Sequence, residues 1–159
     1  MVYILDTNII RTLLTYFPKK GKRYEEVWEK IEKMIKVGTF ISSDECYNEL
    51  VKHFSNNSEQ YKWIHKHKDM FLNPDNMESI IISKLLLNPK MRESVHQKNI
   101  LENRPSADLF IVAKAKAIGA TVVTREKYKP NSAQLPNLCS ELGVSYISYD
   151  DFMEILDEL

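Results

Sequence analysis

Glycine is scarce in this chain of 159 residues: it has four glycines, and none of them forms a Gly-rich phosphate-binding loop. This absence argues against a P-loop or a dinucleotide-binding fold. A Gly-x-Ser-x-Gly elbow is also missing, which argues against an α/β-hydrolase with a serine nucleophile. The sequence has only two cysteines, Cys46 and Cys139, and no Cys/His cluster, so a zinc site is not expected. Their spacing predicts small buried side chains in a reducing compartment rather than a disulfide framework.

The chain also has no net charge and no long hydrophobic run. Lys plus Arg and Asp plus Glu both number 22, so the molecule as a whole has no field that would attract nucleic acid. Five of the acids lie in residues 150–159, which leaves a mildly basic body that is compatible with a polyanionic substrate. The longest apolar stretch, residues 80–87, is too short to span a bilayer. With no charged leader before the first strand, we expect a cytoplasmic protein without a membrane partner.

Hydrophobic spacing predicts an α/β fold in which short apolar strands alternate with amphipathic helices. This alternation is typical of right-handed crossovers between parallel strands. We expect one domain over residues 1–159, with residues 55–103 as a helical insertion over one edge of the sheet. The predicted strands are residues 2–5, 39–41, 120–123 and 144–147. The predicted helices are residues 9–17, 23–37, 46–54, 59–71, 77–87, 91–101, 104–118, 135–142 and 149–159.

Helix starts are predicted from capping residues. Asn8 is expected near the cap of the first helix. Ser42 and Glu45 have the spacing of a capping box for the helix that follows the second strand. Pro105 and Ser106 are expected to start the helix that contains Asp108.

Four acidic residues occupy positions that an α/β sheet would bring to one edge. Asp6 and Glu126 each follow a strand, whereas Glu49 and Asp108 lie on helices that follow loops at the same edge. Ligands of open parallel sheets gather at the carboxyl ends of the strands. Clustered carboxylates repel one another, and oxygen-only ligands favour Mg²⁺ or Mn²⁺. Divalent ions among carboxylates suit the hydrolysis of phosphodiester bonds.

The motifs around these acids resemble those of a PIN domain. They are Leu5-Asp6-Thr7-Asn8 at the start, Glu49-Leu50 on the helix after the second strand, Ala107-Asp108 at the beginning of a helix, and Val122-Val123-Thr124 before an acid. The set is similar to VapC-type toxin ribonucleases of toxin–antitoxin pairs, and more closely to an uncharacterised PIN-like family with a longer helical middle. Residues 55–103 have no match in the compact members.

The resemblance implies a three-layer α/β/α sandwich with a central parallel sheet. It also implies a Mg²⁺ or Mn²⁺ site formed by Asp6, Glu49 and Asp108, with Glu126 as the fourth acid and with Asn8 and Thr124 as supporting residues. The function implied is a metal-dependent endoribonuclease, with RNA as substrate, an antitoxin as partner and a possible homodimer. One departure is that the fourth acid of the family is more often Asp, whereas this chain has the longer Glu126.

Several basic residues are candidates for contacts with backbone phosphates. They are Lys19, Lys20, Lys22, Arg23, Lys127 and Lys129. A solvated loop is the simpler interpretation of such runs.

Other interpretations remain open from the sequence alone. Asp6 could cap a helix, Glu49 could be a solvated acid, and Asp108 could serve only the helix dipole. A catalytically weak or inactive PIN-like module that binds RNA or protein is the main alternative to the nuclease. A phosphatase with Asp6 as nucleophile is less favoured, because Asn8 stands where a second Asp would be needed.

Overall fold

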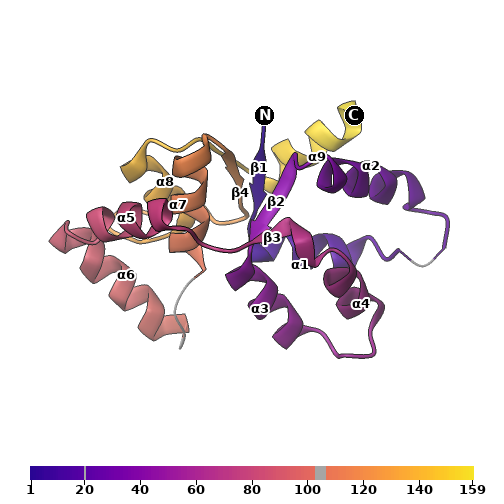
Figure 1. The fold of residues 1–159 in the computed structure, drawn as a ribbon, viewed down its shortest axis with the longest axis horizontal. Coiled ribbons are helices and arrows are strands. Elements are labelled where there is room, and N and C mark those ends of the chain that lie inside the picture. Colours follow the sequence, from indigo (N-terminus) through magenta and orange to yellow (C-terminus); the bar gives the residue numbers. More distant parts are fainter. Residues whose placement is uncertain (20, 103–106) are drawn as a thin grey trace.

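Five parallel strands form the centre of the molecule, in the order β3-β2-β1-β4-β5 (Figure 1). A computed structural model describes residues 1–19, 21–102 and 107–159. The predicted α/β/α sandwich with a central parallel sheet is confirmed. The strands are β1 (Tyr3–Leu5), β2 (Phe40–Ser43), β3 (Phe71–Leu72), β4 (Thr121–Val123) and β5 (Tyr146–Ile147).

The first strand of the chain is the middle strand of the sheet. Tyr3 lies opposite Phe40 of β2 on one side and opposite Thr121 of β4 on the other. Ile4 and Leu5 are at most 1% exposed, which explains why the strand reads as an unbroken apolar run. Because β1 is the middle strand, the residue after Leu5 lies at the centre of the carboxyl edge of the sheet.

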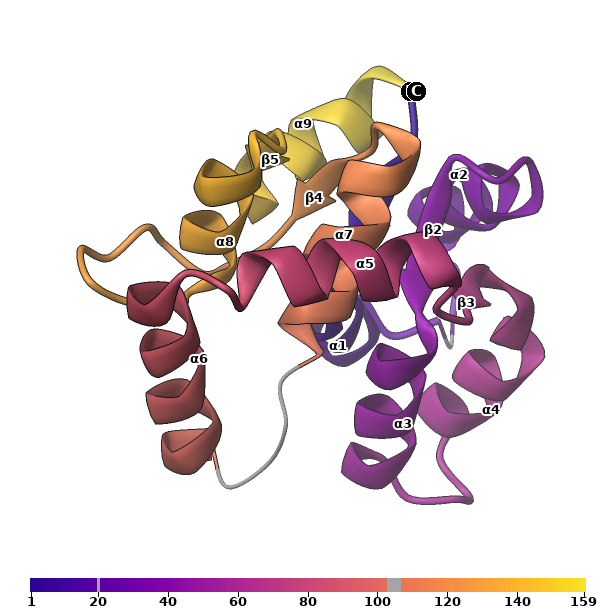
Figure 2. The ribbon, with the colours of Figure 1, turned by 60° about the vertical axis from the view of Figure 1, so that its left-hand side comes forward.

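Helices cover both faces of the sheet. The helices α1, α2 and α9 lie on one face and α7 and α8 on the other, with α5 packed outside α7 (Figures 1 and 2). At the carboxyl edge, α3 and α6 stand on opposite sides (Figure 2). The helices are α1 (Thr7–Tyr16), α2 (Glu25–Lys36), α3 (Asp44–His53), α4 (Glu59–Lys66), α5 (Asn76–Leu85), α6 (Pro89–Glu102), α7 (Asp108–Ile118), α8 (Leu135–Leu142) and α9 (Tyr149–Glu158).

The middle of the chain contributes an edge strand as well as helices. The helix predicted over residues 59–71 ends at Lys66 and is followed by a 3₁₀ turn, η1 (Lys68–Met70), and by β3. Phe71 is buried and pairs with Ser42 of β2. The sequence of this region has a helical pattern, but pairing with β2 at the edge of the sheet makes its last two residues a strand.

The first helix begins slightly earlier than predicted, and one predicted capping box is wrong. The first helix begins at Thr7, so Asp6 and not Asn8 occupies its N-cap position. The predicted capping box of Ser42 and Glu45 does not form, because the Ser42 hydroxyl donates to the Leu5 carbonyl at 2.7 Å and so joins β2 to β1. The residue that caps α3 is Ser43, whose Oγ accepts from the backbone of Cys46. The predicted helix start at Pro105 and Ser106 lies outside the described residues.

The helix α5 is not the fully buried helix that its apolar sequence predicts. Met77 and Ile80 are 55% and 50% exposed, whereas Glu78 is 1% exposed and pairs with Lys114 of α7 at 2.9 Å. Glu78 also accepts from the backbone of Asp75 in a capping box at the start of α5. The side of α5 that faces α7 thus carries an ion pair.

No helix within the described ranges has both the length and the apolar character that a membrane crossing requires.

Candidate active site

The site lies where the strand order reverses. From β1 the chain continues to β2 on one side of the sheet, and β4 flanks β1 on the other side. Such a switch point leaves a crevice at the carboxyl ends of the two strands. Asp6 directly follows β1, and Thr124 directly follows β4.

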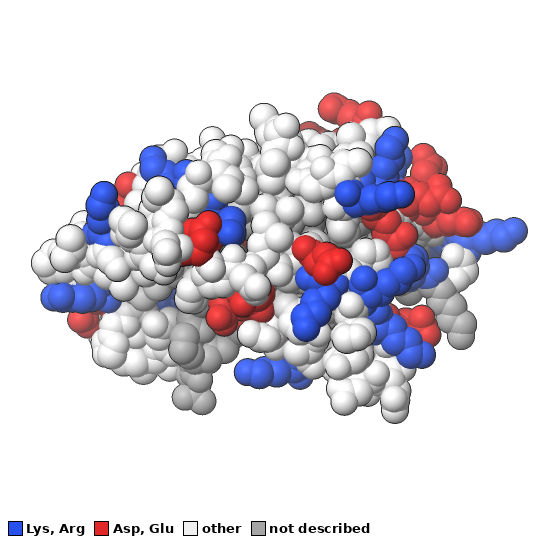
Figure 3. All heavy atoms as spheres, viewed as in Figure 1, with Lys and Arg blue, Asp and Glu red and all other residues white. Residues whose placement is uncertain are grey.

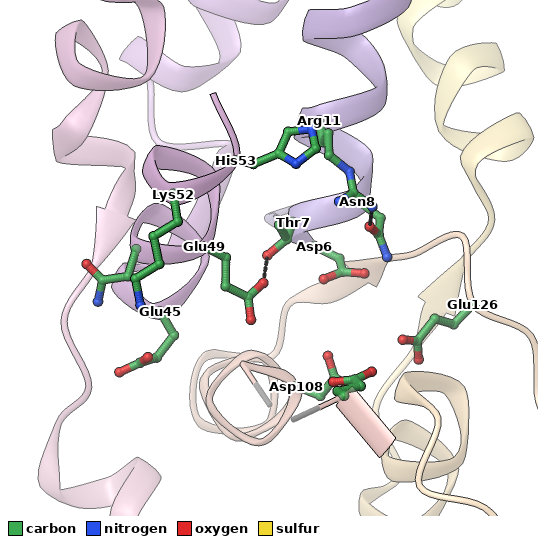
Figure 4. Close-up of a pocket in the computed structure, with 12 residues that line it drawn as sticks. Asp6, Thr7, Asn8, Arg11, Glu45, Glu49, Lys52, His53, Asp108 and Glu126 are labelled. Atoms are coloured by element: carbon green, nitrogen blue, oxygen red, sulfur yellow. Dashed lines mark hydrogen bonds between the residues drawn. The ribbon is translucent and has the colours of Figure 1, made fainter. Parts of the chain in front are cut away.

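The four predicted acids lie around one cavity at this crevice, with a volume of about 410 Å³. Asp6, Asp108 and Glu126 point toward one another, and Glu49 reaches in from α3 (Figure 4). Asn8 also lies in the wall. The other lining residues are Thr7, Arg11, Glu45, Asn48, Lys52, His53 and Glu102.

Asp6 occupies a helix N-cap position without acting as a side-chain cap. Its backbone carbonyl accepts from the amides of Ile9 and Ile10, but its carboxylate makes no capping hydrogen bond. The carboxylate instead accepts from the Thr124 hydroxyl at 3.3 Å and is 4% exposed. The geometry therefore rules out a purely capping role for Asp6, and it places Thr124 in direct contact with it.

Burial and neighbouring charge raise the pKa of Asp6 well above its usual value. Desolvation is the largest cause, and repulsion by Asp108, Glu126 and Glu49 adds to it. Desolvation also raises the pKa of Glu126, with repulsion by Asp108 as the next cause. The cavity holds more negative charge than its own donors stabilise.

Lys98 of α6 partly compensates this charge and was missed by sequence reasoning. Its ammonium donates to Asp108 and, at 3.1 Å, to both carboxylate oxygens of Glu126. Burial opposes the charge on Lys98, but the two carboxylates raise its pKa overall. Lys98 is therefore held as a partly buried cation between Asp108 and Glu126.

Two further contacts orient the acids. The Thr7 hydroxyl donates to Glu49 at 2.6 Å and joins α1 to α3. The Leu135 amide at the start of α8 donates to Glu126 at 2.6 Å. Glu45, which the sequence suggested as a capping partner, lies in the wall of the cavity instead.

The basic residues suggested by the sequence do not line this cavity. Lys19 forms an ion pair with Glu32, and the backbone of Lys129 is held by the side chain of Asn137. Lys22, Arg23 and Lys127 are likewise absent from the cavity wall, and Lys20 lies outside the described residues. The basic side chains that do line the cavity are Arg11, Lys52 and His53.

The donor set fits a hard divalent cation in its chemistry. Its carboxylate oxygens are ligands that Mg²⁺ and Mn²⁺ prefer, and a buried carboxyl with a raised pKa gains most from a nearby cation. In the part of the chain that the structure describes, however, no three His, Cys, Asp or Glu side chains form a ready metal site. An ion would therefore have to draw the carboxylates together and compete with Lys98 for Asp108.

The fold and the carboxylates at its switch point define a PIN-like α/β/α protein. Within that class, the chain belongs to the family described as "Domain of unknown function (DUF4411)", whose model matches residues 3–158. A comparison with curated proteins gives no match. The likeness to two solved VapBC structures confirms the resemblance to PIN domains at the level of the fold.

Solved toxin–antitoxin structures share this fold. The crystal structure of VapBC2 from Rickettsia felis, bound to a DNA fragment from its promoter, matches with a TM-score of 0.54 and 18% identity, covering 93% of this chain and 98% of that one. VapBC-1 from nontypeable Haemophilus influenzae matches with a TM-score of 0.53 and 18% identity, covering 94% of this chain and 99% of that one.

Proposed function

We propose that this chain, as one PIN-like domain over residues 1–159, is a metal-dependent endoribonuclease that hydrolyses RNA phosphodiester bonds. The observation that carries the proposal is the convergence of Asp6, Glu49, Asp108 and Glu126 on one cavity at the switch point. Isolated acids that serve only as caps or surface charges would not gather where they raise the pKa of a buried neighbour.

Asp6, Glu49 and Asp108 would hold Mg²⁺ or Mn²⁺, with Glu126 as the fourth acid. When bound, such an ion supplies a lowered pKa for water and charge stabilisation for the phosphate. The chain's own groups orient the acids: Thr124 holds Asp6, Thr7 holds Glu49, and the Leu135 amide holds Glu126. Asn8 is fixed beside them by a hydrogen bond from Arg11.

The proposal extends to the role of a toxin in a type II toxin–antitoxin system. Its support is the likeness of the fold to the structures of VapBC2 and VapBC-1. A cognate antitoxin would bind this chain and obstruct the cavity, and a homodimer is part of the same proposal. A cytoplasmic location is part of the same proposal.

The experiment that tests the nuclease is cleavage of a mixed pool of structured RNAs with Mn²⁺, with Mg²⁺ and with EDTA. We expect fragments with either ion and none with EDTA, and a higher melting temperature with the ion, because binding to the folded state alone stabilises it. Cleavage that persists in EDTA would contradict the metal dependence. Absence of both cleavage and metal-induced stabilisation would contradict the nuclease.

Replacing Lys98 with Met tests whether its ammonium and the ion share the same carboxylates. We expect the variant to lose on the order of 1–3 kcal/mol without metal, because Asp108 and Glu126 lose a buried charged partner. Mn²⁺ should then raise its melting temperature by more than it raises that of the wild type. Differential scanning fluorimetry with and without Mn²⁺ measures both effects.

The matched control for this prediction is Lys90→Met, an exposed lysine near the start of α6. It should leave the melting temperatures with and without Mn²⁺ close to those of the wild type. An equal metal-induced shift in the Lys98 variant and in the wild type would show that the ion does not compete with the ammonium.

A PIN-like module that binds RNA or protein without cleavage is the second candidate. The observation that favours it is the ammonium of Lys98, which already pairs with two of the acids in the described structure. RNA binding without cleavage, together with no stabilisation by Mn²⁺, would support this alternative.

A further inference from the structure

A second hollow opens beside the acidic cavity and shares part of its wall. It has a volume of about 540 Å³, and Asn8, Arg11 and His53 line both. Figure 4 shows Arg11 and His53 side by side above Asn8 and Thr7, on the side of the cavity away from Asp108. We call this hollow the basic groove. Its remaining wall is formed by Thr12, Thr15, Tyr16 and Arg125.

The charge of the basic groove is opposite to that of the acidic cavity. Its lining includes two arginines and a histidine and no acidic residue, whereas the lining of the acidic cavity includes six acids. Arg11 donates to the Asn8 amide oxygen, and Arg125 donates to the Thr12 hydroxyl at 3.1 Å. Within the described ranges, neither guanidinium is joined to a carboxylate. The Arg125 guanidinium also lies 5.7 Å from the centre of the Tyr149 ring. In the described residues, both guanidinium groups are thus oriented by neutral partners.

This pattern differs from that of the face drawn in Figure 3. On the face drawn in Figure 3, basic and acidic side chains both occur, with acids gathered beside α2 and α9 and bases over α4. Lys19, one of the basic residues suggested by the sequence, forms an ion pair with Glu32. The basic groove combines two arginines whose described partners are neutral with direct continuity to the acidic cavity.

We propose that the basic groove binds the phosphodiester backbone of single-stranded RNA next to the bond that enters the acidic cavity. This inference rests on the proposed function. Guanidinium groups bind phosphate oxygens in charge-assisted hydrogen bonds. Tyr16 in the same wall is 67% exposed and offers a ring on which an unpaired base can stack. The arginines hold the strand, and the acids act on the adjacent phosphate.

The test is equilibrium binding of a short fluorescein-labelled oligouridylate, measured by anisotropy in EDTA, so that affinity is separate from cleavage. All proteins carry Asp6→Asn, which removes one repelling charge from the site. Adding Arg11→Gln and Arg125→Gln should weaken binding by on the order of tenfold or more. The salt dependence of log K should become shallower by about 1.4, because two phosphate contacts to a single strand are lost.

The matched control is the pair Lys33→Gln and Lys36→Gln, which removes two exposed charges from the last turn of α2. It should leave both the affinity and the salt slope close to those of the parent protein. A further pair, Lys22→Gln and Arg23→Gln, tests the basic turn suggested by the sequence. A larger loss in that pair than in the groove pair would overturn the proposal.

The outcomes separate this inference from the proposed nuclease. Unchanged affinity in the groove pair, with RNA cleavage intact in the otherwise wild-type chain, would overturn the groove and leave the nuclease standing. Equal affinity for oligothymidylate would overturn the assignment to RNA. Absence of binding by the parent, together with absence of cleavage by the wild type, would overturn both proposals.

Discussion

The substitution Asp6→Asn is expected to abolish RNA cleavage and, in metal-free buffer, to make the protein more stable. The loss of activity should be roughly a thousandfold or more, because metal stabilisation of charge is worth several kcal/mol and each 1.4 kcal/mol or so is a factor of ten. The gain in stability follows from the position of Asp6, which is 4% exposed and repelled by three other carboxylates. Asn keeps the shape and the acceptor for Thr124 without the charge.

The gain should depend on pH in a defined direction. Because the pKa of Asp6 is higher in the folded than in the unfolded chain, the folded state holds the proton more tightly. The contribution of Asp6 to stability is thus fully present below the unfolded pKa of about 3.9 and declines as the pH rises toward the folded pKa. Asn does not titrate, so the advantage of the variant should grow across this window and then level off.

Chemical denaturation at several pH values without metal measures the effect, and a gain of 1 kcal/mol or so corresponds to about 2–4 °C in melting temperature. Asp157→Asn, an exposed acid on α9, is the matched control and should show no such pH-dependent gain. A destabilised Asp6→Asn in metal-free buffer would mean that the carboxylate is already compensated. Retained cleavage would contradict the assignment of Asp6 to the metal.

The acids of the site were predictable because their signals are local. Ile4 and Leu5 lead directly into Asp6, and Val122 and Val123 lead into Thr124 two residues before Glu126, so an apolar run ends at a polar residue both times. Parallel strands then bring these ends to one edge without further information. What was not predictable is which carboxylate is buried, because desolvation depends on the whole packed neighbourhood.

Lys98 carries no comparable signal. It lies on a weakly amphipathic helix within residues 55–103, and its contact with Glu126 crosses 28 positions of the sequence. The strand β3 was missed for a similar reason, since two residues of strand are specified by pairing with β2 and not by their own pattern. The sequence analysis also missed Arg11, although a signal was present. Asn8, Arg11 and Thr15 recur at helical spacing along one side of α1.

The largest loss of stability is expected from Glu78→Ala. The Glu78 and Lys114 side chains are 1% and 9% exposed, and their charged atoms are 2.9 Å apart. Truncating the acid leaves a buried ammonium with only the Asn73 carbonyl as a described partner, at 3.3 Å. Breaking a buried pair in this way costs about 3–5 kcal/mol. The melting temperature should therefore fall by about 6–20 °C.

The matched control is Glu59→Ala, which removes an acid that is 74% exposed and pairs with Lys62 at 3.8 Å. An exposed pair of this kind is worth about 0–1 kcal/mol, so this variant should melt within a few degrees of the wild type. A loss in Glu78→Ala as small as in this control would show that water reaches Lys114 and that the pair is not buried in solution.

The double variant Glu78→Met and Lys114→Met distinguishes the net value of the ion pair from the cost of breaking it. Both charges disappear together, and the two side chains retain the volume that α5 and α7 need where they pack. Replacing a buried pair with apolar residues is often neutral or stabilising, so the double variant should recover most of the stability that Glu78→Ala loses. The capping contact of Glu78 with Asp75 is lost in both variants, so the difference between them measures the uncompensated ammonium together with the side-chain volume that Ala removes. If the double variant is no more stable than Glu78→Ala, the ion pair does not account for the loss, and the cap at the start of α5 does.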